Sequence, residues 1–376
     1  MKIAILGAGM VGSAIARDLS SKFEVTSFDI SEHNLNNLTN AGINTRQTDL
    51  KRYSDYPVLL GDFDLVVSAV PGFMGYSTLK AIIESNKEVV DISFFPENGL
   101  ELNDLAIIHN VTAIIDCGVA PGMSNLILGY YDSKMEIDSF DCMVGGLPKK
   151  RAKPFEYKAP FSPVDVIEEY MRPARYVENG HVVIKPAMSD TELIDLDHVG
   201  TLESFNTDGL RSILFTMCHI KNMKEKTLRY PGHIDLMKAL FKAGFFDENE
   251  FSFKGIKIRP IEFTSALLFD KWKLEPQEEE FTIMKIVIKG RKDGKHQEIS
   301  YFLYDEFDAV TGISSMSRTT GYTCTAAINL LASKLFTKKG IFPPELVAKE
   351  PGCFEYILNY LRERNVIYKK EVKLLS

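Results

Sequence analysis

The sequence predicts an α/β protein in which a doubly wound parallel-sheet domain is joined to a second, mixed α+β domain. At 376 residues the chain is long enough for two or three domains of about 150 residues each. Strand-like and helix-like stretches alternate over the first ~120 residues, as in parallel sheets with crossover helices. From about residue 136 onward, alternating strands with hairpin turns replace this pattern and indicate a different architecture.

The first domain is predicted from short apolar strands. Residues 65–70 (LVVSAV) are almost continuously apolar, as expected for a strand that is buried on both faces. Helical patterns separate the strands. The predicted strands are 2–6, 24–29, 65–70, 88–93 and 112–117, and the predicted helices are 11–19, 31–40, 73–86 and 100–110.

The second domain is predicted from its turns. Asn179-Gly180 and Asp293-Gly294 each separate two strand-like stretches, and both dipeptides favour two-residue hairpins. Short helices are predicted at 163–171, 208–218 and 234–243, and helical patterns follow at 320–336 and 344–364. We expect the last helices to return to the first domain. The predicted boundaries are therefore 1–122 with about 320–376 for the first domain, and 123–319 for the second.

The composition excludes several classes of partner. Hydrophobic residues make up 45% and charged residues 25%, which are ordinary values for a globular protein. Lys and Arg number 44 against 51 Asp and Glu, so the net charge of −7 does not favour nucleic-acid binding. No run approaches the ~18 apolar residues that span a bilayer. Small molecules, rather than nucleic acids or membranes, are the expected partners.

The number and spacing of the cysteines and histidines indicate the cellular compartment and argue against a metal-binding site. The five cysteines are scattered without a CxxC pair, so we expect neither a disulfide framework nor a zinc site. We therefore expect the protein to lie in the reducing cytoplasm. The seven histidines show no HxxxH spacing, so no metal site is expected. The uncharged stretch 3–16 resembles a signal peptide, but glycines at 7, 9 and 12 would break its helix.

The strongest motif is a glycine loop that follows the first strand and opens a helix. In this context the sequence GAGMVG predicts a dinucleotide-binding site: one glycine makes the turn, one admits a pyrophosphate and one lets helix and strand pack closely. Asp29 ends the second strand, where a carboxylate binds a ribose diol and repels a 2′-phosphate; Glu32 adds to that repulsion. We therefore predict NAD as cofactor. The alternative is a glycine turn without ligand. The loop residues are Gly7, Gly9, Met10, Val11 and Gly12.

Two further strand ends are expected in the same crevice, because ligands lie beyond the carboxyl ends of such strands. Residues 68–72 carry small side chains where a nicotinamide ribose would pass, and residues 117–122 are the point where the chain leaves the first domain. Cys117 is more typical of a buried small residue than of a nucleophile. The predicted cofactor contacts here are Ala69, Val70, Pro71, Cys117 and Gly118.

Basic residues of the second domain gather near predicted helix ends. Arg172 and Arg175 lie at a helix-to-strand transition, and Arg211 falls in a first helical turn, where the helix dipole disfavours a cation and a carboxylate partner is expected. Ion pairs within the protein are the alternative for each of them. His233 follows a turn-rich loop, where a cap or loop role is the alternative to a functional one.

Seven motifs occur in a characteristic order over most of the chain: GAGMVG, SAVPG, DCGVAPGMSN, VGGLP, KAPFSPVDVIEEYMRPARYVENG, ESFNTDGLRSIL and TLRYPGH. In these motifs the chain resembles the saccharopine dehydrogenase-like family, which includes saccharopine reductase and lysine 6-dehydrogenase. The resemblance implies a nucleotide-binding domain, a mixed α/β domain for an amino-acid substrate and for oligomerisation, as a homodimer or homotetramer, and helices that pack back on the first domain.

The chain departs from the saccharopine reductases at three positions. Phe94, Ala120 and Val144 stand where those enzymes tend to have Tyr, Asp and Cys, polar groups that contact saccharopine or assist its imine chemistry. The stretch KAPFSPVDVIEEYMRPARY is instead similar to the lysine 6-dehydrogenase branch. The resemblance therefore favours oxidation of the ε-amine of L-lysine to an imine, which hydrolyses to the 6-semialdehyde and ammonia.

This chemistry requires a group that removes a proton from the amine and an anchor for the distant carboxylate. Asp91, which alternatively acts as a turn acid, Asp116 and His233 are the candidates for the base. The guanidinium candidates for the anchor are those of Arg172, Arg175 and Arg211. Saccharopine or another carboxylated amine is the alternative substrate, and a nicotinamide-binding sensor without catalysis is the alternative class.

Overall fold

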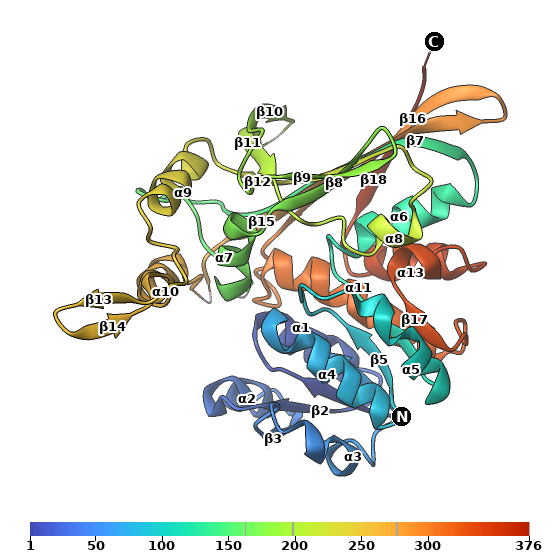
Figure 1. Cartoon of the computed structure of the whole chain (residues 1–376). Coiled ribbons are helices and arrows are strands. Elements are labelled where there is room, and N and C mark those ends of the chain that lie inside the picture. Colours follow the sequence, from blue (N-terminus) through green and yellow to red (C-terminus); the bar gives the residue numbers. More distant parts are fainter. Residues whose placement is uncertain (162, 198, 276, 376) are drawn as a thin grey trace.

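The computed structural model describes residues 1–161, 163–197, 199–275 and 277–375. Within them, a parallel seven-stranded sheet with helices forms one domain, and a nine-stranded mixed sheet forms the second (Figure 1). The fold class is the predicted one. No helix in the described part of the chain is both long and apolar enough to cross a lipid bilayer.

The first domain is doubly wound around β1. Its strand order is β17-β6-β5-β4-β1-β2-β3, so the chain changes direction between β1 and β4. The strands are β1 (Lys2–Leu6), β2 (Glu24–Asp29), β3 (Asn44–Gln47), β4 (Leu65–Ser68), β5 (Glu88–Asp91), β6 (Thr112–Ile114) and β17 (Gly340–Phe342). The helices are α1 (Met10–Ser20), α2 (Glu32–Thr39), α3 (Tyr56–Leu59), α4 (Gly72–Glu84) and α5 (Asn103–Ile108), with 3-10 turns at Tyr53–Asp55 and Gly99–Leu102.

Both faces of this sheet are buried, which explains its continuously apolar strands. Ile3 and Ile5 of β1 pack into one hydrophobic cluster with α1, whereas Ala4 and Leu6 pack into a second cluster with α4. The sequence analysis missed β3, a short strand whose residues (NTRQ) are polar and largely exposed at the sheet edge.

The second domain contains long antiparallel strands and one parallel pair, β7 with β12. The order is β10-β11-β12-β7-β15-β16-β18, with β8 and β9 attached to β12. The strands are β7 (Glu136–Pro148), β8 (Ala174–Glu178), β9 (His181–Lys185), β10 (Glu192–Leu196), β11 (Gly200–Asn206), β12 (Asn222–Arg229), β15 (Glu280–Lys292), β16 (Lys295–Glu306) and β18 (Tyr368–Leu374). Both predicted hairpin turns are present, and all four of their residues have positive φ.

The helices of the second domain differ from the prediction at three places. The predicted helix at 208–218 shrinks to α8 (Ile213–Thr216), because Arg211 has a φ of +48° and ends a loop rather than opening a helix. The structure adds α10 (Pro260–Trp272), which the sequence analysis missed, beside the projecting hairpin β13 (Phe251–Phe253) and β14 (Ile256–Ile258) (Figure 1). The helix α6 (Met123–Asp132) was not predicted either, whereas α7 (Pro163–Met171) and α9 (His233–Lys242) lie where helices were expected.

The C-terminal segment belongs to both domains. As predicted, α11 (Ser315–Ala332) packs on α1, with Cys324, Ala327 and Ile328 in the same cluster as Ile15. After α12 (Pro344–Val347) and α13 (Cys353–Arg362), however, β18 pairs antiparallel with β16. The last residues therefore complete the second sheet, which differs from the predicted return of the whole segment 320–376 to the first domain.

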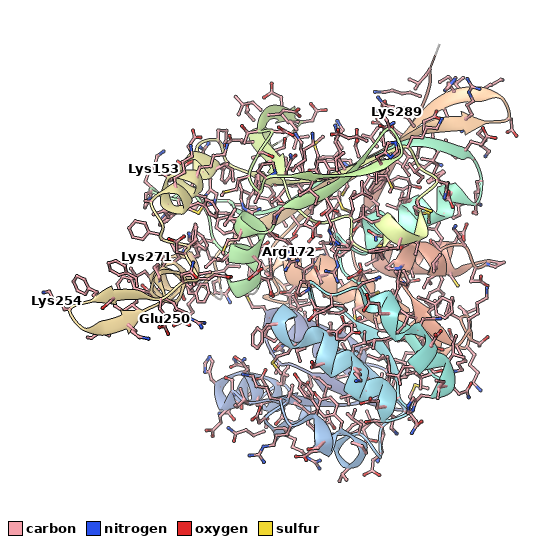
Figure 2. The ribbon with its side chains drawn as sticks, in the orientation of Figure 1. Lys153, Arg172, Glu250, Lys254, Lys271 and Lys289 are labelled. Atoms are coloured by element: carbon pink, nitrogen blue, oxygen red, sulfur yellow. The ribbon has the colours of Figure 1, made fainter. Side chains whose placement is uncertain are left out.

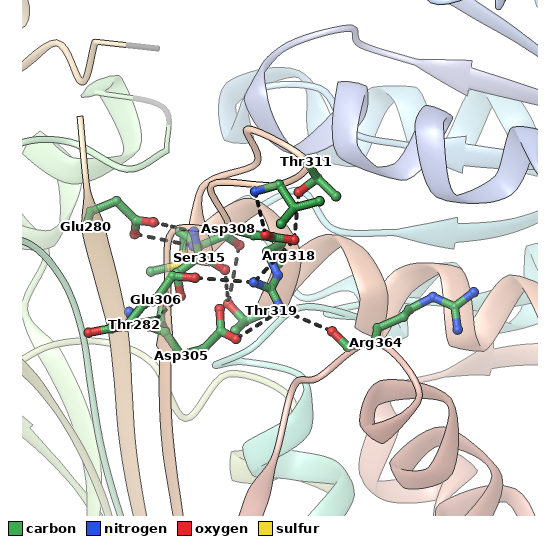
Figure 3. Close-up of polar contacts among 12 residues, drawn as sticks. Glu280, Thr282, Asp305, Glu306, Asp308, Thr311, Ser315, Arg318, Thr319 and Arg364 are labelled. Atoms are coloured by element: carbon green, nitrogen blue, oxygen red, sulfur yellow. Dashed lines mark hydrogen bonds and ion pairs between the residues drawn. The ribbon is translucent and has the colours of Figure 1, made fainter. Parts of the chain in front are cut away.

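A buried polar cluster holds the start of α11 against the second sheet (Figure 3). The Glu280 carboxylate at the start of β15 accepts hydrogen bonds from the backbone N–H groups of Ser315 and Met316, the latter at 3.4 Å. Burial raises the pKa of Glu280 to about 7. A carboxylate at a helix N-terminus satisfies otherwise unpaired N–H groups, so this contact fixes where α11 begins.

Arg318, one turn further along α11, ties together the remaining parts of the cluster. Its guanidinium lies 3.4 Å from the Asp305 carboxylate and donates hydrogen bonds to the carbonyl oxygens of Glu306 at 3.3 Å and Arg364 at 3.0 Å. These partners belong to the end of β16 and to the segment after α13 (Figure 3). Because α11 packs on the first domain, this cluster fixes the second sheet relative to the first.

Candidate active site

The two domains enclose a cavity of about 770 Å³. The first domain lines it at the carboxyl ends of β1, β2 and β4, at the switch point where open α/β sheets bind ligands. The second domain lines it with residues of α7, β7 and β12, and α11 contributes Met316 and Thr320. The cavity thus joins a nucleotide end to an end built from the second domain.

The glycine loop provides a free helix N-terminus at the nucleotide end. Gly9 caps α1 without a side-chain hydrogen bond, and the first turn contains no acidic residue. Gly7 has a φ of +106°, and a Cβ atom on Gly12 would lie 2.1 Å from the Gly7 carbonyl oxygen. The unpaired N–H groups and the helix dipole suit a pyrophosphate, so this loop fits a dinucleotide. Gly7, Gly9, Met10, Val11 and Gly12 all line the cavity.

Asp29 lies beside this loop at the end of β2. Its carboxylate accepts hydrogen bonds from the backbone N–H of Ala8 at 2.7 Å and of Ser31 at 2.8 Å, and it lines the cavity. These two bonds fix its orientation and leave acceptor sites for a ribose diol. Asn34 and Lys51 line the same end.

Cys117 differs from the other residues predicted to contact a cofactor. Ala69, Val70, Pro71 and Gly118 line the cavity, but Cys117 does not. It is 2% exposed, and its thiol faces the carbonyl oxygen of Thr323 at 3.8 Å. Burial, followed by the nearby carboxylates, raises the pKa of this thiol. The position is that of a buried packing residue, the reading that the sequence favoured.

Two of the predicted arginines are held by carboxylates of the chain itself. Arg211 and Asp116 form a buried ion pair at 2.7 Å, and Arg211 also donates to the carbonyl oxygen of Phe95. Arg175 binds both oxygens of Asp208, at 2.9 and 2.8 Å. Neither guanidinium lines the cavity, whereas both carboxylates do. The carboxylate partner expected for Arg211 is therefore Asp116, a side chain predicted as a candidate base.

Arg172 is the predicted arginine that reaches the cavity. It lies at the end of α7, between the two domains (Figure 2). Its guanidinium contacts Glu168 at 3.4 Å and lies 5.3 Å from the centre of the Phe94 ring, and it makes no closer ion pair with any residue that the structure describes. A guanidinium held this weakly retains donors for a carboxylate ligand.

The other two predicted bases lie behind the wall of the cavity. Asp91 is fully buried and is hydrogen-bonded by the backbone N–H and hydroxyl of Ser93, at 3.0 and 3.1 Å; burial raises its pKa to about 7. His233 is 2% exposed, and burial, followed by the charge of Arg229, lowers its pKa to about 3. Neither side chain lines the cavity, so neither is placed to meet a substrate directly.

His233 instead belongs to a network that fixes Arg229. Its Nδ1 atom lies 2.9 Å from the Phe155 carbonyl oxygen, so Nδ1–H donates there and Nε2 accepts from the hydroxyl of Tyr170 at 2.9 Å. The Tyr170 oxygen in turn accepts from Nε of Arg229 at 3.2 Å. Arg229 also pairs with Glu169 at 2.8 Å. Arg229 lines the cavity, and these bonds hold its guanidinium in a fixed orientation.

The sequence analysis missed two groups of lining residues. Alternate residues of β12 point to one face of the sheet, which brings Glu225, Thr227 and Arg229 to the cavity. Successive turns of α7 add Asp165 and Glu169. The run of polar residues in KEKTLR is the signal that could have identified the first group, because such a run is unusual in a strand that is mostly buried.

Glu225 is one of the strongly perturbed groups of this set. Its side chain is 4% exposed, and burial, followed by repulsion from Glu169 and Asp208, raises its pKa to about 8. Its backbone carbonyl accepts from the hydroxyl of Tyr176, but no hydrogen bond to its carboxylate is present among the described residues. Perturbed carboxyl groups in a cavity are typical of active sites.

The second-domain end of the cavity is therefore rich in carboxylates. Two guanidinium groups, those of Arg172 and Arg229, face it as well. This arrangement can bind a cationic amine together with a carboxylate. The acidic residues are Asp116, Asp165, Glu168, Glu169, Asp208 and Glu225. In the described part of the chain, no three His, Cys, Asp or Glu side chains are grouped to hold a metal ion.

A dinucleotide-binding domain joined at this cavity to a domain with an acid-rich wall defines a two-domain oxidoreductase. Family models agree with this class. The saccharopine dehydrogenase NADP binding domain matches residues 3–114, and the saccharopine dehydrogenase C-terminal domain matches residues 118–367. The chain belongs to the saccharopine dehydrogenase family.

Similar proteins cover the chain to different extents. Carboxyaminopropylagmatine dehydrogenase of Synechocystis is 22% identical, over 93% of this chain and 94% of that protein. Mitochondrial alpha-aminoadipic semialdehyde synthase of Mus musculus is 24% identical over 71% of this chain, which spans 31% of that longer protein. Saccharopine dehydrogenase (L-Glu forming) of Saccharomyces cerevisiae has the same fold, with a TM-score of 0.80, 20% identity and 99% coverage of both chains.

Proposed function

We propose that the chain is an NAD-dependent dehydrogenase that oxidises the C–N bond of a cationic amino acid, with the ε-amine of L-lysine as the first candidate. The observation that carries this proposal is the second-domain end of the cavity, which is lined by several carboxylates and by Arg172, whose guanidinium is available to bind a substrate carboxylate. The products are an imine, which water converts to the aldehyde, and ammonia.

The residues of the chain divide this work between them. A nicotinamide dinucleotide, when bound along the glycine loop, supplies the acceptor for the hydride that leaves the carbon bearing the amine. Arg172 holds the substrate carboxylate, and the carboxylates of α7 and β12 attract the ammonium groups and orient them. The apolar wall at Phe94, Ala120 and Val144 excludes water beside them. Because only a neutral amine releases hydride, a base must also remove a proton.

NAD rather than NADP is the proposed cofactor, because the Asp29 carboxylate repels a 2′-phosphate. We expect the wild-type protein to bind NADH at least about tenfold more tightly than NADPH, a difference of about 1.4 kcal/mol. Asp29→Ala should narrow this gap, chiefly by weakening NADH binding. Titration of both reduced cofactors by protein fluorescence measures the two affinities, and equal affinities in the wild-type protein would contradict the proposal.

A carboxylated secondary amine is the second candidate substrate. The similarity over nearly the whole chain to carboxyaminopropylagmatine dehydrogenase favours it. The same cavity features suit such a molecule, since it also combines cationic nitrogen with a carboxylate. The apolar side chains of Phe94, Ala120 and Val144 in the cavity wall argue against saccharopine itself, because the polar groups of the saccharopine reductases are missing there.

The co-product separates these candidates. L-lysine with NAD should yield NADH and ammonia in equal amounts, without any need for glutamate. Saccharopine would release glutamate and no ammonia, and another carboxylated secondary amine would likewise release a primary amine or amino acid instead of ammonia. Enzymatic ammonia assay and mass spectrometry of the products measure this. Tight NADH binding without turnover of any of these amines would instead support a nicotinamide-binding sensor.

A further inference from the structure

Glu225 occupies an unusual position for an acidic side chain. It lies on β12 with Thr227 and Arg229 on the cavity face, whereas Lys226 turns to the other face and binds the Asp190 carbonyl oxygen at 2.7 Å. Its carboxylate is buried, lines the cavity and accepts no hydrogen bond within the described residues. A buried carboxylate without hydrogen bonds carries a desolvation cost, so its presence in the cavity wall calls for an explanation.

The chain makes room for this carboxylate. Gly209 lies directly against it, and a Cβ atom at residue 209 would come within 1.5 Å of its Oε1 atom. The packing therefore holds the side chain of Glu225 toward the cavity. Any larger residue at position 209 would displace it.

The groups that face Glu225 come from several elements. Burial is the largest influence on its pKa, which rises to about 8, and the carboxylates of Glu169 and Asp208 raise it further. The charge of Arg211 lowers the pKa of Glu225, and the charge of Asp116 raises it. On the neighbouring strands, β7 contributes the buried thiol of Cys142 and β8 contributes Tyr176, whose hydroxyl binds the backbone of Glu225.

Four of the other carboxylates at this end of the cavity already bind groups of the protein. The pairs are Asp116–Arg211, Asp208–Arg175, Glu169–Arg229 and Asp165 with the backbone N–H of Gly72. The fifth, Glu168, makes a 3.4 Å contact with Arg172, and its side chain is 43% exposed, whereas Glu225 is buried.

We propose that Glu225 is the catalytic residue that takes the proton from the substrate ammonium, an inference that rests on the proposed function. In this step an N–H bond of the ammonium breaks and an O–H bond forms on the Glu225 carboxylate. The nitrogen keeps the electron pair and donates it into the new C=N bond as hydride leaves for NAD. Glu225 then releases the proton to water, and hydrolysis of the imine consumes one water molecule and yields aldehyde and ammonium.

The chemistry of the two groups suits this transfer. A free lysine ammonium has a pKa of about 10.4, and an ordinary glutamate has a pKa of about 4.3. With the pKa of Glu225 at about 8, the difference in pKa between the substrate ammonium and the glutamate falls from about 6 to about 2 pKa units, which makes the proton transfer less unfavourable. A base is most effective when its pKa lies near the working pH.

Glu225→Gln tests the proposal, because it keeps the shape and removes the base. We expect kcat to fall about 10²–10⁴-fold, the usual contribution of a general base, with KM and NADH affinity within a few-fold of the wild type. The wild-type kcat/KM should rise through a midpoint near pH 8, and the variant should lose this rise. Glu225→Asp should restore part of kcat. Glu178→Gln, at an exposed ion pair with Lys185, is the matched control.

A measurement without substrate gives a second readout. Infrared titration of the protein should show a carboxylic-acid band that disappears near pH 8 in the wild type and is missing from Glu225→Gln. If the wild type oxidises an amine, but Glu225→Gln retains this band and a kcat within threefold of the wild type, the proposed role of Glu225 is wrong. The proposed function would then still stand. A wild-type protein that binds NADH and oxidises no amine would overturn the proposed function, and the role of Glu225 with it.

Discussion

Arg318→Met is expected to lower the free energy of unfolding by about 3–5 kcal/mol, the usual cost of removing one partner from a buried ion pair. The substitution leaves Asp305 buried without its cation, and the carbonyl oxygens of Glu306 and Arg364 lose their donor (Figure 3). Urea denaturation followed by circular dichroism measures the change.

Arg259→Met is the control for this experiment. Arg259 is exposed and pairs with Glu262 on the surface of α10 at 3.5 Å. We expect this control to change stability by no more than about 0.5 kcal/mol. A loss below about 1 kcal/mol in Arg318→Met would show that the cluster does not hold the two domains as described.

Arg172→Met is expected to raise KM for the amino-acid substrate about 10–100-fold and to leave kcat nearly unchanged. A hydrogen bond to a charged group contributes about 1.5–3 kcal/mol, and an anchor far from the reacting carbon stabilises ground state and transition state alike. The weak contact of Arg172 with Glu168 leaves its guanidinium available for this purpose. Steady-state kinetics over a wide substrate range give both constants.

The substitution Arg172→Lys distinguishes the contribution of the positive charge from that of the planar guanidinium geometry. Arg172→Lys should recover part of the lost affinity, because an ammonium keeps the charge but not the planar pair of donors. NADH affinity should stay unchanged in both variants. A fall in kcat with KM unaltered would contradict the assignment of Arg172 as a carboxylate anchor.

The nucleotide end of the cavity could be predicted from short motifs in the sequence. The glycine loop, the strand before it and Asp29 lie within the first 29 residues, and each depends on short-range geometry that the sequence pattern displays. The same holds for the two hairpin turns, where Asn-Gly and Asp-Gly adopt positive φ angles.

The substrate end depends on contacts between distant residues, which the pattern could not display. Asp116 and Arg211 were predicted separately as a base and an anchor, yet they are 95 positions apart and bind each other. Arg175 likewise finds Asp208. Glu225 was missed because a strand of mostly polar residues looks solvent-exposed until the facing domain is known.

The C-terminal strand shows the same limit. The residues of β18 (YKKEVKL) are mostly charged and exposed, as expected of an edge strand protected against further pairing. Nothing in this short stretch indicates that its partner is β16 rather than a strand of the first domain. The pairing follows from the path of α13, whose Phe354, Ile357 and Leu361 pack in the core of the second domain.

The central claim is that the cavity joins the cofactor to the carbon that bears the substrate amine. Incubation of the protein with NAD and L-lysine deuterated at C6, followed by mass spectrometry of the reduced cofactor, tests it most directly. We expect NADH that carries one deuterium, and unlabelled NADH when the deuterium is placed at C2. NADH without deuterium from the C6-labelled substrate, or no NADH at all, would contradict the proposed oxidation at C6 of lysine.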